Sequence, residues 1–345
     1  MTTAVPPRYE PSHLAPVVAT PKIGEIACRN LVNSRYGLEE GLRSEGDCLV
    51  CGTAISKWTK AVMAPFLARR IWNRAAFEIR LAECTACGFK FFNPRLEPDE
   101  ERRLYSGYRD GIYRRQRHAC EPWYTESFNR SLSGEAELGR RKACLRQILS
   151  EHRRPYSVSS LLDFGGASGE LVQDLIPGAE AYVYDISEVE PAPGVQRLRS
   201  LEEGKARPFD LIVCSNVLEH VGYPRNLVDQ LAQVVSPGGL AFLEVPCESP
   251  CGLSNFTKRM IQEFILFGTH PAIALTLLQR GTTQAMHEHV NFFRPAVLQR
   301  LLTARQWKVI ATGTYKLGRM PFAGEMVWSL ARRGSLPLTA AAGPG

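Results

Sequence analysis

The chain has 345 residues, of which 44% are hydrophobic and 22% are charged, a composition typical of a soluble globular protein. This length leaves room for one large domain and one small one. No apolar run is long enough to cross a bilayer, because residues 264–278 are few and are interrupted by Gly268 and Pro271. The net charge of +7 is compatible with an anionic partner or with an ordinary solvated surface. The N-terminus lacks an apolar signal core, so we expect a cytoplasmic protein.

Two pairs of cysteines with the same spacing stand in the N-terminal third. Cys48 and Cys51 form one pair and Cys84 and Cys87 the other, and a glycine follows each pair. Two residues between cysteines make a turn that directs both thiolates at one ion, and four soft ligands favour a tetrahedral zinc site. Because no ligand position is left open for a substrate, we expect this zinc to be structural. The alternative is a set of unrelated buried cysteines.

The segment from Trp58 to Arg80 separates the two pairs and is expected to be an inserted helix or hairpin. Residues 130–152 have the apolar spacing of a helix that leads into the core domain. The expected segments are a disordered tail (1–25), the zinc-binding module with a linker (26–125), a linking helix (126–156), the core domain (157–333, with 247–293 as an insertion) and a second disordered tail (334–345).

The stretch from Leu161 to Glu170 predicts a buried strand, a glycine turn and the start of a helix. A diphosphate-binding fingerprint would need glycine at the positions of Ala167 and Glu170, so that fingerprint is broken. Asp163 precedes the turn, and its carboxylate suits a ligand with ammonium and sulfonium charges. A second strand ends at Asp185, where a carboxylate can accept hydrogen bonds from ribose hydroxyls. The pattern therefore predicts a site for a nucleoside with a cationic tail.

Four blocks resemble the motifs of class I S-adenosylmethionine-dependent methyltransferases. The glycine turn resembles motif I with Ala167 in place of the middle glycine, and Asp185 resembles the acidic tip of motif II. Residues 209–221 resemble the fourth strand and the loop behind the cofactor, and residues 231–246 resemble the turn into the fifth strand. The resemblance implies an α/β fold with a Rossmann-like seven-stranded sheet and helices on both faces. It also implies that the cofactor contacts Asp163, Gly165, Gly166, Gly169, Asp185, Ile186, Ser215 and Asn216.

The rest of the core domain follows this order. Strand and helix patterns alternate through residue 246, as a parallel sheet requires. The insertion at 247–293 is expected over the C-terminal edge of the sheet, where open α/β sheets bind substrates. Helices are expected at 226–235 and 295–306, and strands at 307–312 and 322–331.

The segment after the second cysteine pair contains Phe91–Arg95 and the tyrosines Tyr105 and Tyr108. This combination resembles the N-terminal zinc-binding module of deoxysugar C-methyltransferases. The resemblance implies a small-molecule substrate, with a nucleotide-linked sugar as the leading candidate. Tyr105, Tyr108 and Tyr113 are candidates for the substrate mouth, and the alternative is that they only pack a helix against its neighbour.

Two histidine segments are candidates for acid–base chemistry. The first is His220, which follows Glu219 at the end of the fourth strand; its alternative role is structural. The second is the segment Met286–Pro295. By resemblance to the deoxysugar C-methyltransferases, His289 would be the base and Glu288 its partner or a substrate ligand, although the tyrosine of that family falls on Met286. A metal site at His287 and His289, or a polar loop with no catalytic role, is the alternative.

The sequence thus predicts methyl transfer from S-adenosylmethionine to a small molecule, most readily a nucleotide-sugar, with His289 or His220 as base and a structural Zn²⁺. Nucleic acid is not the expected partner. An RNA or protein methyltransferase that grips its substrate with the zinc module is one alternative, and a non-catalytic binding protein with this fold is another. For residues 264–278 the pattern leaves open a dimer face in a homodimer, a lid or a helix that touches a membrane.

Overall fold

The computed structural model describes residues 46–131, 135–152, 157–187, 189–248, 285–317 and 324–334. The predicted N-terminal tail, all but one residue of the C-terminal tail, and most of the predicted insertion lie outside these residues. Within them the strands form a seven-stranded sheet and a five-stranded sheet. No helix in the described ranges combines the length and apolar character that crossing a membrane requires.

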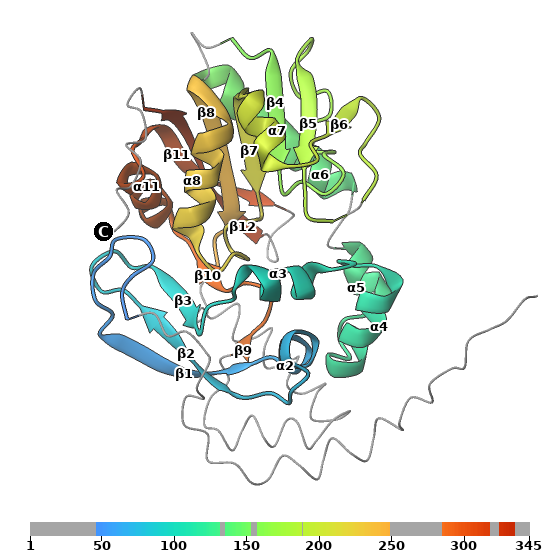
Figure 1. Ribbon diagram of the computed structural model, residues 1–345, viewed down its shortest axis with the longest axis vertical. Helices are drawn as coiled ribbons and strands as arrows, with labels where there is room; N and C mark the ends of the chain where they lie inside the picture. The colour runs from blue at the N-terminus through green and yellow to red at the C-terminus, as the bar shows by residue number, and fades with distance from the viewer. Residues whose placement is uncertain are drawn as a thin grey trace, which may run out of the picture. The chain divides into compact units, whose positions relative to one another are not determined.

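The seven-stranded sheet has the order β11-β12-β8-β7-β4-β5-β6 (Figure 1). Its central strands pair in parallel, while β12 pairs antiparallel with both β8 and β11. Strands β4 and β7 are almost wholly buried, as expected for the centre of a parallel sheet. The predicted α/β fold is therefore confirmed. The strands are β4 (Ser160–Phe164), β5 (Glu180–Tyr184), β6 (Val195–Arg197), β7 (Phe209–Ser215), β8 (Val235–Pro246), β11 (Trp307–Leu317) and β12 (Gly324–Arg333).

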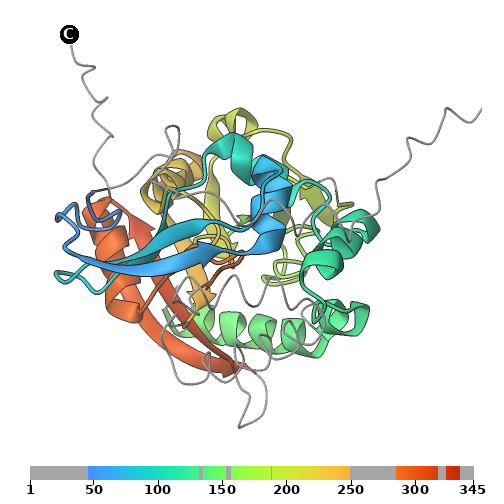
Figure 2. The ribbon, with the colours of Figure 1, turned by 90° about the horizontal axis from the view of Figure 1, so that it is seen from below.

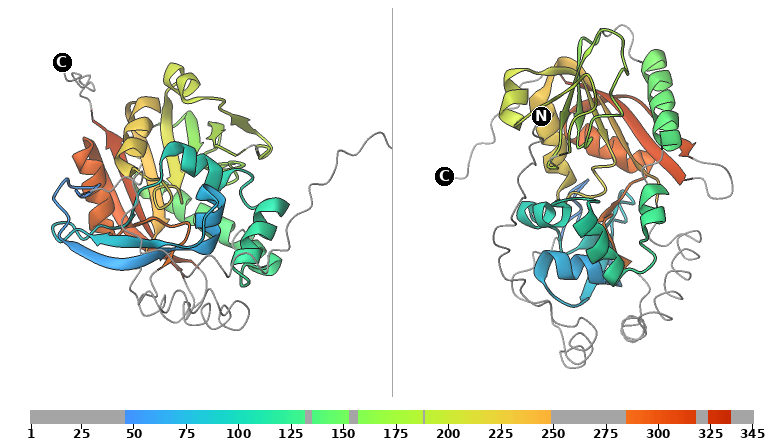
Figure 3. Two further views of the ribbon diagram at one scale, coloured as in Figure 1. Left: turned by 60° about the horizontal axis from the view of Figure 1, so that its bottom comes forward. Right: turned by 90° about the vertical axis from the view of Figure 1, so that its right-hand side faces the viewer.

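Helices cover both faces of this sheet. On one face lies α6 (Glu135–His152), whose Leu145, Ile148 and Leu149 pack against the strands. On the opposite face lie α7 (Leu201–Ala206) and α8 (Pro224–Val234), as the right panel of Figure 3 shows. Helix α11 (Pro295–Ala304) packs its apolar side into the same core as α8. Two continuous hydrophobic cores therefore enclose the sheet.

One predicted element is absent. The residues after the glycine turn, 170–177, form successive turns rather than the expected helix. Asp174 has a φ of 52°, which a right-handed helix cannot contain. Pro177 and Gly178 then end the segment, leaving too few residues to offset the cost of nucleating a helix.

The N-terminal part forms the five-stranded sheet, in the order β10-β3-β2-β1-β9. The segment between the cysteine pairs is a strand, a helix and a strand, with β1 running directly into α2 (Figure 2). Four short helices accompany the sheet. These elements are β1 (Lys57–Met63), β2 (Glu78–Glu83), β3 (Lys90–Asn93), α2 (Pro65–Trp72), α3 (Pro98–Tyr105), α4 (Gly111–Cys120) and α5 (Glu126–Ser131).

The two edge strands of this sheet come from the far end of the chain. Strand β9 (Ala285–Met286) pairs with β1, and β10 (Asn291–Phe292) pairs with β3. The residues between them therefore pass from one edge of the N-terminal sheet to the other. Burial alternates along this stretch: Met286, Glu288 and Val290 are buried, whereas His287 and His289 are partly exposed.

Candidate functional site

The four predicted zinc ligands meet at one point. The Sγ atoms of Cys48 and Cys87 are 3.6 Å apart and those of Cys51 and Cys84 are 3.5 Å apart. All four sulfur atoms lie within 4.8 Å of one another, and none forms a disulfide. Four thiolates around a tetrahedral zinc ion at about 2.3 Å stand about 3.8 Å apart, so the donor set and its spacing fit zinc.

The glycine turn follows β4 and is shaped by Gly165 and Gly166. Gly165 has a φ of 77°, in the left-handed region that glycine adopts without strain. A Cβ atom on Gly166 would lie 2.0 Å from the Cγ atom of Asp163, so only glycine fits above that carboxylate. Ala167 also has a left-handed φ, of 52°, where glycine is the easier residue.

Asp163 carries the clearest sign of a missing cationic ligand. Its side chain is buried, and both carboxylate oxygens lack a hydrogen-bond partner among the described residues. Burial raises the pKa of this carboxyl group to about 7, and nearby Arg141 only partly opposes the shift. A buried carboxylate without a partner is costly, and a ligand with an ammonium group would offset that cost. This arrangement fits the methionine end of S-adenosylmethionine.

Asp185 holds the turn in place from the end of β5. Its Oδ2 atom accepts a hydrogen bond from the backbone N–H of Ala167 at 2.8 Å, and Oδ1 accepts one from Ser187 at 2.6 Å. A carboxylate has further lone pairs with which to accept from a ribose. Ile186, next to it, is 59% exposed, an unusual state for a large apolar side chain and one that suits an aromatic base lying against it.

The predicted cofactor residues after β7 differ in their availability. Ser215 is buried and donates a hydrogen bond to Oε1 of Glu244 at 2.6 Å, and Arg141 of α6 binds the same pair. Ser215 is therefore already engaged in a buried network. Asn216 has a left-handed φ of 57°, and its buried Oδ1 atom has no hydrogen-bond partner among the described residues. Asn216 is thus the freer of the two to meet a ligand.

The two histidine segments are joined by backbone hydrogen bonds. The carbonyl oxygen of Glu219 accepts from the N–H groups of Val290 at 2.7 Å and Asn291 at 3.1 Å. The side chain of Asn291 donates to the carbonyl oxygens of Leu218 and Val221, both at 2.7 Å. The loop after β7 and the segment between β9 and β10 therefore act as one unit.

This joining brings the candidate histidines into contact. The rings of His220 and His289 have centroids 4.8 Å apart, and Glu219 lies beside them. The Nδ1 atom of His220 is 2.9 Å from the hydroxyl oxygen of Tyr105 and 3.1 Å from the carbonyl oxygen of Glu288. The Nδ1 atom of His289 is 2.7 Å from Oε2 of Glu248. His220 and His289, the two alternative candidates for the base, thus belong to one cluster.

The electrostatics of this cluster follow from burial and from the carboxylates. Burial lowers the pKa of His220 to about 3 and raises the pKa of Glu219 to about 7. Burial would also lower the pKa of His289, but the adjacent Glu248 overcomes this and raises it to about 9. In the protein without bound ligands, His220 is therefore neutral at pH 7 and His289 is charged.

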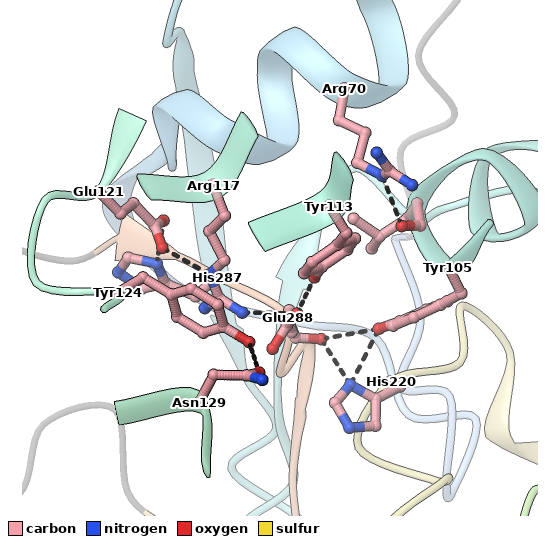
Figure 4. Close-up of polar contacts among 11 residues, drawn as sticks. Arg70, Tyr105, Tyr113, Arg117, Glu121, Tyr124, Asn129, His220, His287 and Glu288 are labelled. Carbon is pink, nitrogen blue, oxygen red and sulfur yellow. Dashed lines mark hydrogen bonds and ion pairs between the residues drawn. The ribbon is translucent and has the colours of Figure 1, made fainter. Parts of the chain in front are cut away.

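The side chain of Glu288 lies in a polar group with residues of helix α4, and His287 joins the same group through Glu121 (Figure 4). Tyr113 donates a hydrogen bond to its Oε1 atom, and Arg117 approaches the same oxygen at 2.7 Å. Arg117 also donates to the buried carboxylate of Glu121 at 2.8 Å, which in turn lies 3.0 Å from Nδ1 of His287. Burial would raise the pKa of Glu288, but Arg117 lowers it to about 2. The side chain of Glu288 is therefore an ionised anchor to α4, not a partner of His289.

Sequence reasoning missed several residues that shape this site. Arg117 on α4 and Glu121 at its C-terminal end follow the candidate Tyr113 at intervals of four residues. That spacing was a signal, but a polar stripe usually marks a solvated face. Arg141 and Glu244 gave no signal, because an arginine in a helix and a lone acid in a strand are each common.

A family comparison decides which class of protein this is. The model of a family described as a methyltransferase domain matches residues 132–312, which is more than half of the chain. The chain belongs to this methyltransferase family. Its fold and its motifs are those of the class I S-adenosylmethionine-dependent enzymes. The prediction of that class is thus confirmed.

Two relatives with established names match over part of the chain. One is a ubiquinone biosynthesis O-methyltransferase of Aromatoleum aromaticum, 30% identical over 151 residues, which covers 39% of this methyltransferase and 58% of the relative. The other, of the same name, is from Thiobacillus denitrificans. It is 30% identical over 165 residues, which covers 43% of this methyltransferase and 64% of the relative. The methyltransferase thus spans about three fifths of these relatives. Their names concern ubiquinone and O-methylation, so they lend no support to a sugar substrate or to C-methylation.

Solved structures were also compared. A 1,6-didemethyltoxoflavin N1-methyltransferase of Burkholderia thailandensis, bound to its substrate and S-adenosylhomocysteine, is 15% identical with a TM-score of 0.42, covering 74% of this methyltransferase and 95% of that chain. The N-methyltransferase NodS of Bradyrhizobium japonicum with S-adenosylhomocysteine is 16% identical with a TM-score of 0.37. The match covers 62% of this methyltransferase and 92% of that chain.

Proposed function

We propose that this methyltransferase transfers the methyl group of S-adenosylmethionine to a hydroxyl oxygen of a small molecule. The observation that carries the proposal is the buried, unpartnered carboxylate of Asp163 beneath the glycine turn. Asp163, Gly165, Gly166 and Gly169 hold the methionine end of the cofactor, Asp185 holds the ribose and Ile186 lies against the base. Asn216 completes this site from the end of β7, with Ser215 behind it.

The Glu219–His220–His289 cluster is the acceptor site in this proposal. Its side chains are mostly buried: Glu219 is 2% exposed, and the side chains of His220 and His289 are 16% and 31% exposed. A mostly buried cluster suits a small molecule better than a strand of RNA or a folded protein. The names of the relatives favour oxygen as the acceptor atom. In-line methyl transfer mainly requires alignment, which the cluster can provide by binding the hydroxyl group.

A structural zinc ion bound by Cys48, Cys51, Cys84 and Cys87 belongs to the same proposal. The spacing of the sulfur atoms supports it, as does the place of Cys48 and Cys84 in the buried core. Zinc at this position would fix the turns that carry the N-terminal sheet.

Calorimetric titration with S-adenosylhomocysteine tests the cofactor site. We expect binding by the wild type and a Kd raised about tenfold or more by Asp185→Ala, the scale of a lost hydrogen bond to a charged group. Glu190→Ala is the matched control, because Glu190 is an exposed acid a few residues away. Equal binding by the wild type and Asp185→Ala contradicts the site assignment, and no binding by any of the three favours a non-catalytic protein.

Methylation of carbon on a nucleotide-linked sugar is the second candidate. It is favoured by the cysteine centre and by the presence of His289, which this reaction would use as its base. An assay with a methyl donor labelled with carbon-13 separates the two, because NMR of the product distinguishes the methyl carbon of an ether from a methyl carbon bonded to carbon.

A further inference from the structure

Among the residues that the structure describes, Glu219 is, like Asp163, a buried carboxylate with no recorded hydrogen bond to its oxygens. Both of its oxygens lack a hydrogen-bond partner among the described residues, although the side chain is almost fully enclosed. Nε2 of His220 lies 3.8 Å from Oε1 of Glu219, too far for a hydrogen bond. Such a group is explained by an ion or ligand that would lie against it.

The ring of His220 has a definite orientation. Its Nδ1 atom lies 3.1 Å from the backbone carbonyl oxygen of Glu288, and a carbonyl oxygen can only accept. We therefore assign the ring proton to Nδ1, which leaves the lone pair of Nε2 directed towards Glu219. The hydroxyl group of Tyr105, 2.9 Å from the same Nδ1, adds a second contact on that side.

His289 is held in the same manner. Its Nδ1 atom lies 2.7 Å from the carboxylate of Glu248, so Nε2 is the ring atom that could bind an ion, once it has given up its proton. Histidines that bind metal ions characteristically donate their other N–H group to a carboxylate or a backbone carbonyl. His220 has the carbonyl partner and His289 has the carboxylate partner.

We propose that Glu219, His220 and His289 form a binding site for a divalent transition-metal ion, with zinc as the best-suited ion. One ligand atom from each residue lies within 4.8 Å of the others. Bonds of about 2.0–2.2 Å place ligand atoms about 3–3.5 Å apart, so closure on an ion needs movements of about 1 Å. Two imidazoles and one carboxylate suit zinc and its first-row neighbours, and three protein ligands leave a position open.

The open position gives this site a role in the reaction. An acceptor oxygen can complete the coordination, and a divalent ion lowers the pKa of a hydroxyl group that it binds. This inference goes beyond the proposed function: as ligands, the two histidines would orient the acceptor, and its hydroxyl proton, made more acidic by the ion, would be lost to water instead of to a histidine. Binding of the ion itself does not depend on the methyl-transfer proposal.

Metal stoichiometry tests the inference, with His287 as an internal control. His287 and His289 stand on the same segment, have equally exposed side chains and each pair Nδ1 with a carboxylate, but only His289 lies in the cluster. Metal-free protein is dialysed against Zn²⁺ and its metal content measured. We expect the wild type and His287→Gln to bind one ion more per chain than Glu219→Gln and His289→Gln. Binding of S-adenosylhomocysteine and the ion of the four cysteines verify that each variant is folded.

Cobalt separates the two classes of site by their ligands. Co²⁺ bound by the four cysteines gives a thiolate charge-transfer band, whereas Co²⁺ at the cluster gives only ligand-field bands. Glu248→Gln should weaken the cluster's Kd by about 10–100-fold, the usual effect of losing a carboxylate behind a histidine ligand. Equal metal content in all four proteins overturns the proposal, as does loss of the ion from His287→Gln. Failure of methyl transfer with intact metal binding would count only against the proposed function.

Discussion

Replacing Arg95 by methionine should strongly destabilise this methyltransferase. Arg95 is 2% exposed, and its guanidinium group donates to five oxygen atoms. They are the carbonyl oxygens of Phe92 (2.6 Å), Gly222 (2.7 Å), Val221 (3.1 Å) and Val290 (3.3 Å) and Oδ1 of Asn291 (2.6 Å). One side chain therefore joins the end of β3 to both segments that carry the histidines.

The magnitude follows from what the substitution leaves behind. A hydrogen bond to a charged group contributes about 1.5–3 kcal/mol, but the five are not additive, because water and small shifts satisfy some of the carbonyl groups. We expect a loss of about 3–5 kcal/mol in the free energy of unfolding, the cost of breaking a buried charged network. Arg95→Lys should recover little of this free energy, since the single ammonium group of lysine cannot reach all of the oxygens that the planar guanidinium group contacts.

Urea denaturation followed by tryptophan fluorescence and circular dichroism measures this loss. Arg102→Met is the control, because its side chain is 66% exposed and its recorded partner among the described residues is Asp99 in α3; its loss should stay below about 0.5 kcal/mol. A loss of less than about 1 kcal/mol for Arg95→Met would refute the reasoning, because the loops would then be held together without this arginine.

Three further substitutions have defined outcomes. Burial raises the pKa of Asp163 from 3.8 to about 7, so the stability it contributes is present at low pH and lost as the pH rises through 7. Asp163→Asn should therefore raise the free energy of unfolding at pH 8 by about 1–3 kcal/mol. In the wild type, the Kd for S-adenosylhomocysteine should rise about tenfold for each pH unit below pH 7, because Asp163 becomes protonated. The Asp163→Asn variant should lose this pH dependence. Ala167→Gly should stabilise by about 0.5–1 kcal/mol, because it relieves a left-handed alanine, as thermal unfolding can verify. Tyr113→Phe removes one hydrogen bond to Glu288 but leaves Arg117, so denaturant unfolding should show a loss of about 1–2 kcal/mol; no change would mean that Arg117 alone suffices.

The core domain was predictable because its signals are local. The buried strand before Gly165, the turn itself and the helix at 224–234 are each specified by neighbouring residues. The missing helix at 170–177 shows the limit, since apolar spacing was present but a left-handed Asp174 and the following proline were decisive. Periodicity over five residues cannot distinguish a helix from a series of turns.

The candidate site was predictable only in its parts. Each histidine was a candidate by itself, but nothing local showed that they meet. Strands β9 and β10 have two residues each, too few for a periodic signal, and their partners lie about 200 positions earlier. Arg95, too, looked like part of a motif and not like the residue that joins both loops. Long-range pairing of this kind is specified by tertiary packing.

Removal of the proposed structural zinc should therefore impair the acceptor site, which depends on the N-terminal sheet, and leave the cofactor site intact. Cys48, Cys84, Phe89 and Phe91 pack in the same hydrophobic core as helices α8 and α11, and the N-terminal sheet that they anchor holds the segment with His289. The glycine turn and Asp163 lie on the other sheet. Cys84→Ser should consequently lower methyl-transfer activity by more than about tenfold while changing the Kd for S-adenosylhomocysteine by less than about threefold, since only the acceptor side depends on the cysteine centre.

The control for this substitution is Cys144→Ser, a half-buried cysteine on α6 away from the four-cysteine cluster. It should alter neither activity nor metal content. If Cys84→Ser weakened cofactor binding as much as it weakened turnover, the two sheets would form one cooperative unit, and the N-terminal module would be part of the cofactor site instead of a support for the acceptor site. If it changed neither, the cysteine centre would contribute nothing to catalysis, and β9 and β10 would hold His289 in place through the remaining contacts of the sheet alone.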